Sequence, residues 1–222
     1  MCSCVRKWSH AAAFRFDIKT FDKNFDSEAT FDSEGFSQSK ALVDDIVARE
    51  VASGIPHNRI ILGGFSQGGA VALFTGLQAQ HALGGLLVLS SWMPARWRFP
   101  AQLSSVAKGV PIWQGHGTMD PLIPLPLAQM SHEFLKGLGL TASLSTCVRD
   151  IAPLLLRLLM LFNRYKMEHS SHPKEMADVV AWLQQRLPQV RIGVGIFACT
   201  HAAFHSFLLH SLAAGNHRVT AF

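Results

Sequence analysis

Residues 59–74 read "RIILGGFSQGGAVALF", an apolar run that meets a glycine-rich turn and then becomes apolar again. Arg59–Phe65 has the continuous apolar pattern of a strand that is buried on both faces of a parallel sheet. Ala70–Gln80 then has a helical pattern of apolar residues. The stretch therefore predicts a buried strand, a tight turn and a helix in direct succession.

The turn itself holds a complete G-x-S-x-G motif at Gly64–Gly68. A nucleophilic serine needs a strained turn between strand and helix, and small residues on both sides let the two elements approach. The hydroxyl of Ser66 then points out above the sheet, and the backbone N–H of Gln67 at the helix start is placed to stabilise an oxyanion. We therefore expect Ser66 to be a nucleophile.

The letters "GFSQ" also occur at Gly35–Gln38, and this copy has different flanks. No strand precedes it, and the helical pattern begins directly after it, at Ser39. A serine at such a position is most simply a helix cap. We expect Ser37 or Ser39 to be a cap, and neither to be a nucleophile.

Strand and helix patterns alternate along the rest of the chain. Met1–Phe36 has no helical stripe and predicts a long loop with one short strand at most. The remaining predicted elements are a helix from Ser39 that stops at Gly54-Ile55-Pro56, strands at Gly85–Ser90 and Val110–Gln114, and helices at Leu125–Leu138 and Pro173–Leu187. Such alternation predicts an α/β fold with a doubly wound, mostly parallel sheet. Functional sites in this architecture form at the carboxyl ends of the strands.

An elbow serine needs a histidine base and a carboxylate that orients it, in the chain order Ser, Asp, His. Asp120 lies in the Gly-rich loop "GHGTMDPLIP" after the third predicted strand, and His169 lies in "MEHSSHPKEM" before the last helix. The alternative for Asp120 is an Asx turn before a proline. His116 and His172 are competing bases, but we expect His116 to bond locally and His172 to cap the helix that starts at Pro173.

Composition limits the other classes of function. The chain has 222 residues, is 49% hydrophobic and carries a net charge of +5, which suits one globular domain. Its basic residues are scattered, so nucleic-acid binding is not expected, whereas association with an anionic membrane surface is possible. The four cysteines lack the spacing of a metal site or a disulfide framework, and Cys199, His201 and His205 alone do not predict a metal. Met1–Phe16 has no apolar core of a secretory leader, which favours a cytoplasmic protein.

Two apolar segments do not fit the alternation. Ile151–Phe162 lies between two predicted elements, and Ile192–Gly215 contains no Asp, Glu, Lys or Arg. The second segment is long enough to span a bilayer, but its histidine, serine and threonine residues make a span a poor fit. We interpret it as interfacial or extraneous sequence. S-acylation of Cys2 or Cys4 is a further possible route to a membrane, against an ordinary disordered N-terminus.

Four motifs follow one another along the chain: "IPHNRIILGGFSQGGAVALFTGL", "SSWMP", "QGHGTMDPLIP" and "HSSHPKEMADVVAWLQQRLP". Together they resemble the acyl-protein thioesterases, the lysophospholipase/carboxylesterase group of α/β-hydrolases. The resemblance implies a Ser66–Asp120–His169 triad and hydrolysis, with no cofactor, of palmitoyl thioesters on proteins, of lysophospholipids or of small esters. It also implies that Trp92, with Met93 and Leu122, binds the substrate. A cytoplasmic location, with possible nuclear or transient membrane localisation, would follow.

The chain also departs from this family. The family usually begins with an apolar strand and an H-G-x-G-D loop that supplies a second oxyanion donor, and no such stretch precedes Phe14. We therefore expect an N-terminally truncated hydrolase domain at 14–188, after a divergent segment at 1–13, and an uncovered edge on the strand at Arg59–Phe65. An atypical insertion at about 141–161 would displace His169, and 189–222 would be an apolar extension. The alternative function is a catalytically impaired acyl-binding or interaction remnant of the same fold.

Overall fold

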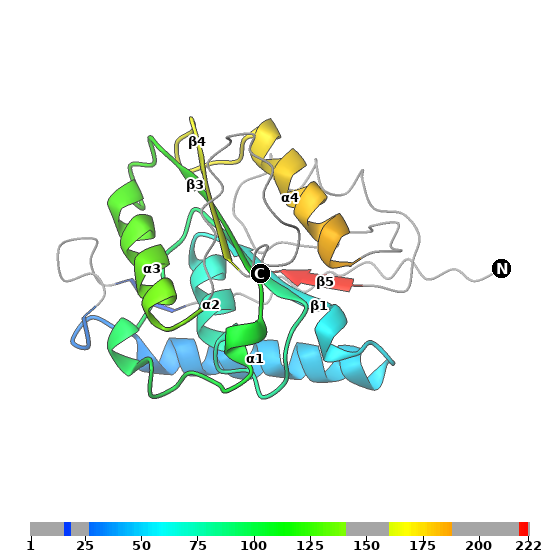
Figure 1. The fold of residues 1–222 in the computed structure, drawn as a ribbon. Helices are drawn as coiled ribbons and strands as arrows, with labels where there is room; N and C mark the ends of the chain where they lie inside the picture. Colours follow the sequence, from blue (N-terminus) through cyan, green and yellow to red (C-terminus); the bar gives the residue numbers. More distant parts are fainter. Residues whose placement is uncertain (1–15, 19–26, 141–159, 188–217, 222) are drawn as a thin grey trace.

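The computed structural model describes residues 16–18, 27–140, 160–187 and 218–221 (Figure 1). In this part of the chain, a single sheet carries helices on both faces, as the alternation of patterns predicted. The strands are β1 (Ile60–Phe65), β2 (Gly85–Leu89), β3 (Ile112–Gly117), β4 (Met160–Tyr165) and β5 (Arg218–Ala221). Their order in the sheet is β4-β3-β2-β1-β5, and every neighbouring pair is parallel. The predicted α/β fold with a mostly parallel sheet is confirmed.

The helices are α1 (Ser33–Ala52), α2 (Gln67–Gly76), α3 (Leu125–Gly137) and α4 (Pro173–Arg186), with short 3-10 helices at His57–Arg59, Arg96–Arg98 and Ala107–Gly109. Strand side chains alternate between the two faces of the sheet. Ile60 and Leu62 pack in one core cluster with residues of α1, α2 and α3, whereas Ile61 and Phe65 pack in another with residues of α4 (Figure 1). Because both faces are covered, the central strands β1 and β2 are buried along their whole length and carry continuous apolar runs.

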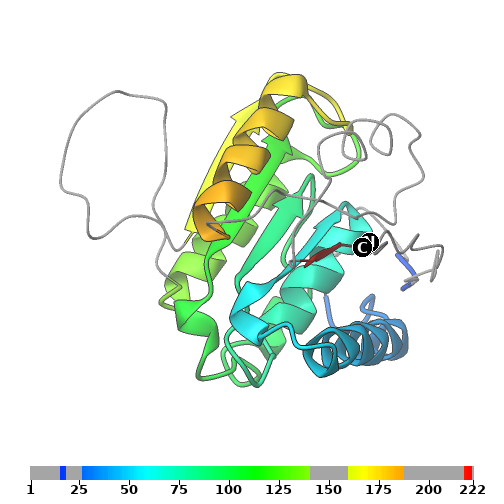
Figure 2. The same cartoon turned by 90° about the vertical axis from the view of Figure 1, so that its right-hand side faces the viewer.

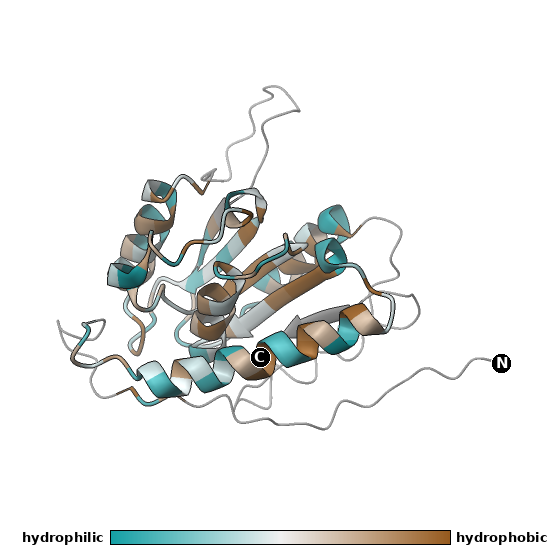
Figure 3. Ribbon diagram, turned by 90° about the horizontal axis from the view of Figure 1, so that it is seen from below, coloured by the Kyte–Doolittle hydropathy of each residue, from teal (hydrophilic) through white to brown (hydrophobic). Residues whose placement is uncertain are grey.

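The first helix begins earlier than its apolar pattern indicated. Asp32 is the N-cap, and its side chain accepts a hydrogen bond of 2.9 Å from the backbone N–H of Gly35. The prediction that Ser37 or Ser39 caps a helix is wrong, since both lie inside α1 and the Ser37 hydroxyl donates to the carbonyl of Ser33. Figure 3 shows the mixed polar and apolar surface of this helix. The predicted stop is confirmed, because Gly54 has a φ of +96°.

The outer edge of β1 is paired, contrary to expectation. Residues Ile60–Gly63 pair in parallel with Arg218–Ala221, so β5 lies beside β1 (Figure 2). The last part of the predicted extension at 189–222 therefore contributes a strand to the sheet. An unpaired strand edge exposes a row of backbone N–H and C=O groups, and β5 satisfies the groups of β1 that face it.

Other predictions fall outside the described residues. They concern the segment at 1–13, most of the insertion at 141–161, the acylation sites Cys2 and Cys4, and Cys199, His201 and His205. The end of the insertion is inside the described part, where it forms the start of β4. In the described ranges, none of the helices combines the length and the apolar character needed to cross a bilayer.

Candidate active site

Ser66 occupies a strained turn between β1 and α2. Its φ is 55° and its ψ is −121°, in a region that L-residues adopt only when the surrounding structure enforces it. The Ser66 N–H donates to the carbonyl of Leu89 on β2 over 2.9 Å, which anchors the turn. A Cβ at Gly64 would lie 2.2 Å from the carbonyl carbon of Gly68. Strand and helix therefore approach so closely that only glycine fits at Gly64, as the motif requires.

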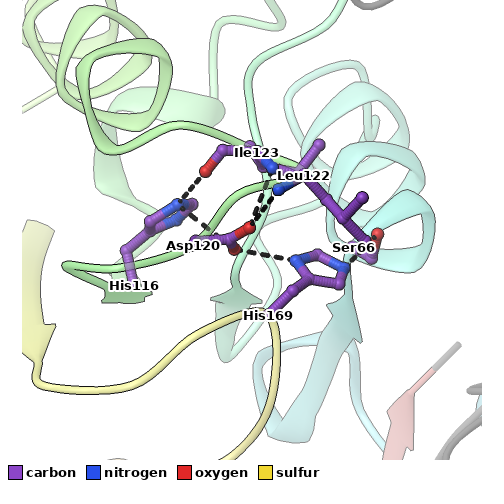
Figure 4. Close-up of polar contacts among 6 residues, drawn as sticks. All are labelled: Ser66, His116, Asp120, Leu122, Ile123 and His169. Carbon is purple, nitrogen blue, oxygen red and sulfur yellow. Dashed lines mark hydrogen bonds and ion pairs between the residues drawn. The ribbon is translucent and has the colours of Figure 1, made fainter.

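Hydrogen bonds link three predicted residues, with His169 between Ser66 and Asp120 (Figure 4). His169 Nε2 is 3.0 Å from Ser66 Oγ, and His169 Nδ1 is 2.7 Å from Asp120 Oδ2. A carboxylate oxygen only accepts, so Nδ1 carries the proton and Nε2 is free to accept the serine proton. The expected displacement of His169 is therefore not observed.

Their positions follow from the parallel sheet. Ser66, Asp120 and His169 follow the carboxyl ends of β1, β3 and β4, which lie at the same edge of the sheet. The His169 ring also lies against Phe65, with 4.7 Å between ring centroids. This contact places an apolar wall next to the imidazole.

Asp120 uses its two carboxylate oxygens for different partners. Oδ1 accepts hydrogen bonds of 2.9 Å from the N–H groups of Leu122 and Ile123, whereas Oδ2 faces His169. Burial raises the pKa of Asp120, but the bonds from His169, Ile123 and Leu122 outweigh it and hold this pKa below its ordinary value. The carboxylate is therefore ionised at neutral pH. The Asx turn that was the alternative for Asp120 exists together with the contact to His169.

The two competing histidines bond locally, as predicted. His116 Nε2 donates to the carbonyl of Ile123 over 2.8 Å, and burial lowers the pKa of His116. His172 is the N-cap of α4, where its Nδ1 accepts from the backbone N–H of Lys174. Neither ring has a hydrogen bond to Ser66 among those that the described residues show.

The start of α2 faces the site. Gln67 is its first residue, and the first N–H groups of a helix have no acceptor within the helix. The helix dipole adds positive potential there, which suits an oxyanion. The Gln67 side chain donates to the carbonyl of Phe16 over 3.2 Å, so residues 16–18 lie against this end of the helix. No local pattern in residues 1–36 indicates this contact, which joins residues 51 positions apart in the chain.

Phe16 connects this segment to the predicted substrate residues. Its ring stacks on Phe36 at 3.9 Å and meets the edge of Trp92 at 6.0 Å. Trp92 is buried, and Met93 is buried in the same core cluster with its N–H bonded to Ser131 Oγ at 2.9 Å. Leu122 is different, because 54% of it is exposed, next to Asp120 in the chain. The structure therefore places Trp92 and Met93 in the core and Leu122 at the surface.

A metal site is not formed by the residues that the structure describes. Nowhere in these ranges do three His, Cys, Asp or Glu side chains lie close enough together to hold an ion. The polar groups at the carboxyl edge of the sheet instead form the linear chain from Ser66 to Asp120. Such a chain suits proton transfer from a hydroxyl.

The sequence of this chain is similar to those of several known proteins. Residues 12–160 match the model of the phospholipase/carboxylesterase family. Acyl-protein thioesterase 1 of Cryptococcus neoformans is 37% identical over 176 residues, which are 78% of this chain and 70% of that protein. Acyl-protein thioesterase 1 of Gibberella zeae is 35% identical over 176 residues, which are 78% of this chain and 68% of that protein.

Solved structures agree on the fold. SOBER1 of Arabidopsis thaliana superposes with a TM-score of 0.59 and 29% identity, over 70% of this chain and 66% of that one. Acyl-protein thioesterase 2 of Zea mays has a TM-score of 0.56 and 24% identity, over 70% of this chain and 66% of that chain. The chain thus spans about two thirds of the length of these structures.

Proposed function

Because this chain belongs to the phospholipase/carboxylesterase family, whose members include acyl-protein thioesterases, we propose that it is a serine hydrolase that cleaves acyl thioesters and esters. Its preferred substrates would be proteins with a fatty acyl group on cysteine, and lysophospholipids would be a second class. The observation that carries the proposal is the chain of hydrogen bonds from Ser66 through His169 to Asp120. It starts at a serine whose backbone is held in a strained conformation.

The reaction would follow from this geometry in two steps. His169 Nε2 takes the hydroxyl proton while Ser66 Oγ attacks the acyl carbon, and the imidazolium then donates that proton to the departing thiolate or alkoxide. Water attacks the resulting acyl-serine with His169 again as the base, which releases the fatty acid and restores Ser66. Asp120, ionised and bonded to Nδ1, keeps the ring in the required tautomer and stabilises its charged form. The backbone N–H of Gln67 would bind the oxyanion in both steps.

The proposed substrate class is supported by the names of the relatives and by the apolar residues next to Asp120. Thioesters and esters share an acyl carbonyl, so one nucleophile serves both. The two relatives are named acyl-protein thioesterase 1, and the exposed Met119 and Leu122 flank Asp120 with apolar surface. We propose that Leu122 contacts the acyl chain, and that the buried Trp92 and Met93 support the site from the core.

A fluorophosphonate probe, which reacts with activated serines, tests the proposal directly. The wild-type chain should be labelled, Ser66→Ala should not, and Ser37→Ala should be labelled like the wild type. Palmitoyl-thioester peptide and lysophosphatidylcholine should then be compared as substrates. A chain that melts cooperatively but remains unlabelled would refute the hydrolase and favour an acyl-binding remnant.

A further inference from the structure

The loop that carries Asp120 is fixed by a second histidine. His116 is the penultimate residue of β3, and only 1% of it is exposed. Its Nε2 lies 2.8 Å from the carbonyl oxygen of Ile123 and 3.7 Å from Asp120 Oδ2 (Figure 4). A carbonyl oxygen only accepts hydrogen bonds, so Nε2 carries a proton and donates it to Ile123.

Both polar backbone groups of Ile123 therefore form hydrogen bonds with side chains. Its N–H donates to Asp120 Oδ1 at 2.9 Å, and its carbonyl accepts from His116. Hydrogen bonds thus run in sequence from His116 through Ile123 to Asp120. With Oδ1 engaged by backbone groups, the carboxylate presents Oδ2 to His169.

The charge of His116 matters, because it faces the same oxygen as His169. A protonated ring 3.7 Å from Oδ2 would compete with His169 for the negative charge of Asp120. The pKa of His116 is lowered, mainly because the ring is buried. The bond to Ile123 and the charge of Asp120 raise this pKa by less, and His169 lowers it further. A neutral His116 can hold the loop without drawing the carboxylate away.

We propose that His116 is a positioning residue, which holds the 120–123 turn so that Asp120 Oδ2 meets His169 Nδ1. This role rests on the proposed function, since it acts through His169 and not on the substrate. It requires an N–H donor at the position of Nε2 and no positive charge.

Two substitutions of His116 separate the donor from the ring. In His116→Gln the amide nitrogen replaces Nε2 as a neutral donor, whereas His116→Phe fills the space without a donor. His132→Phe is the matched control. His132 on α3 is also buried, and its Nδ1 lies 2.9 Å from Oε1 of Gln114. Gln114 is on β3, like His116, but lies farther from the carboxyl end of that strand. Should His116→Phe not fold, His116→Asn, whose shorter amide does not reach Ile123, takes its place.

The variants are compared by kcat and KM on a small ester, with active sites counted by fluorophosphonate. His116→Phe should lower kcat by about 10²-fold, the loss expected for a misplacement of about 1 Å, with KM within about twofold. His116→Gln should recover most of this loss. His132→Phe should lower the melting temperature but leave kcat per active site within about twofold. Equal kcat losses in His116→Phe and His132→Phe, or no recovery in His116→Gln, would overturn the inference.

A measurement without turnover separates this inference from the proposed function. The His169 Nδ1–H bonded to Asp120 should give a far-downfield proton resonance in the wild type and in His116→Gln. In His116→Phe the resonance should be lost through exchange with water. If the resonance is present in the wild type and lost in His116→Phe, but the wild type hydrolyses no ester, only the proposed function is refuted. If the resonance persists in His116→Phe, only the positioning role is refuted.

Discussion

Replacing Glu175 with glutamine should change how the stability of this protein depends on pH. Glu175 lies in the first turn of α4 and is 1% exposed, and its Oε1 has no hydrogen-bond partner among the residues that the structure describes. That oxygen faces β3, since a Cβ at Gly115 would lie 2.4 Å from it. Burial raises the pKa of Glu175 from 4.5 to about 8, although a backbone hydrogen bond at His172 opposes the shift.

The difference between the pKa of Glu175 in the folded and in the unfolded protein sets the size of the change in the free energy of unfolding. Between pH 4.5 and about pH 8 the folded protein keeps a proton on Glu175 that the unfolded chain has released. Each pH step of one across this window lowers the free energy of unfolding by about 1.4 kcal/mol. The contribution of Glu175 is therefore fully present below pH 4.5 and is lost as the pH rises towards 8. Over the whole window the loss is at most about 5 kcal/mol, of which about 3 kcal/mol has occurred by pH 7.

Glu175→Gln keeps the shape and an acceptor oxygen but removes the titrating proton. The variant should match the wild type near pH 5 and exceed its melting temperature at pH 7 by about 6–12 °C, from about 2–4 °C per kcal/mol in a chain of this size. Thermal and urea unfolding of both proteins at pH 5, 6, 7 and 8 would measure the difference. Glu133→Gln on α3 is the control, since that side chain is 65% exposed and pairs with Lys136 at the surface. A stability difference for Glu175→Gln that stays constant from pH 5 to 8, as in the control, would refute the reasoning.

Three further predictions concern single side chains. Asp120→Asn should lower ester hydrolysis by about 10⁴-fold while the fold persists, because His169 would adopt the wrong tautomer; unchanged turnover in a p-nitrophenyl ester assay would leave Asp120 only its role in the turn. Ser37→Ala removes a hydroxyl that donates to the carbonyl of Ser33 within α1, so hydrolysis should stay within about twofold, and a complete loss would overturn the choice between the two serines. Burial lowers the pKa of His132 below 6.5, so the unfolded chain binds more protons as the pH falls below 6.5 and the free energy of unfolding decreases. His132→Asn, which keeps a donor to Gln114, should make this acid loss shallower by up to about 1.4 kcal/mol per pH step, as urea unfolding at pH 5 and 7 would measure.

Local sequence was sufficient for the elements whose pattern is strong. β1, β2 and α4 begin within one residue of their predicted starts, and the cap at His172 follows from the adjacent proline. These features depend on residues that are neighbours in the chain: continuous apolar runs, amphipathic stripes and cap residues. The elbow at Ser66 belongs to the same class, because glycines at fixed spacing determine its tight turn.

Elements with weak local patterns were missed or shifted. The third strand was predicted at Val110–Gln114 but β3 reaches Gly117, because residues 115–117 pair with Asn163–Tyr165 of β4. The apolar pattern of the helix did not indicate the N-cap Asp32. The second bond of this side chain, from the backbone N–H of Asp17, is not a local signal either. β5 has only four residues, and it is a strand because it pairs with the outer edge of β1.

By itself the sequence determined the fold class, the strained serine and three candidate residues for a catalytic site. Only the tertiary structure decided that His169 meets Asp120, 49 residues away, and Ser66, 103 residues away. It also assigned His116 to Ile123 and placed Glu175 against β3. The reason is physical: backbone conformation is largely set by nearby side chains, whereas contacts across a sheet depend on strand order and register. Those are fixed only when distant segments bury their apolar faces together.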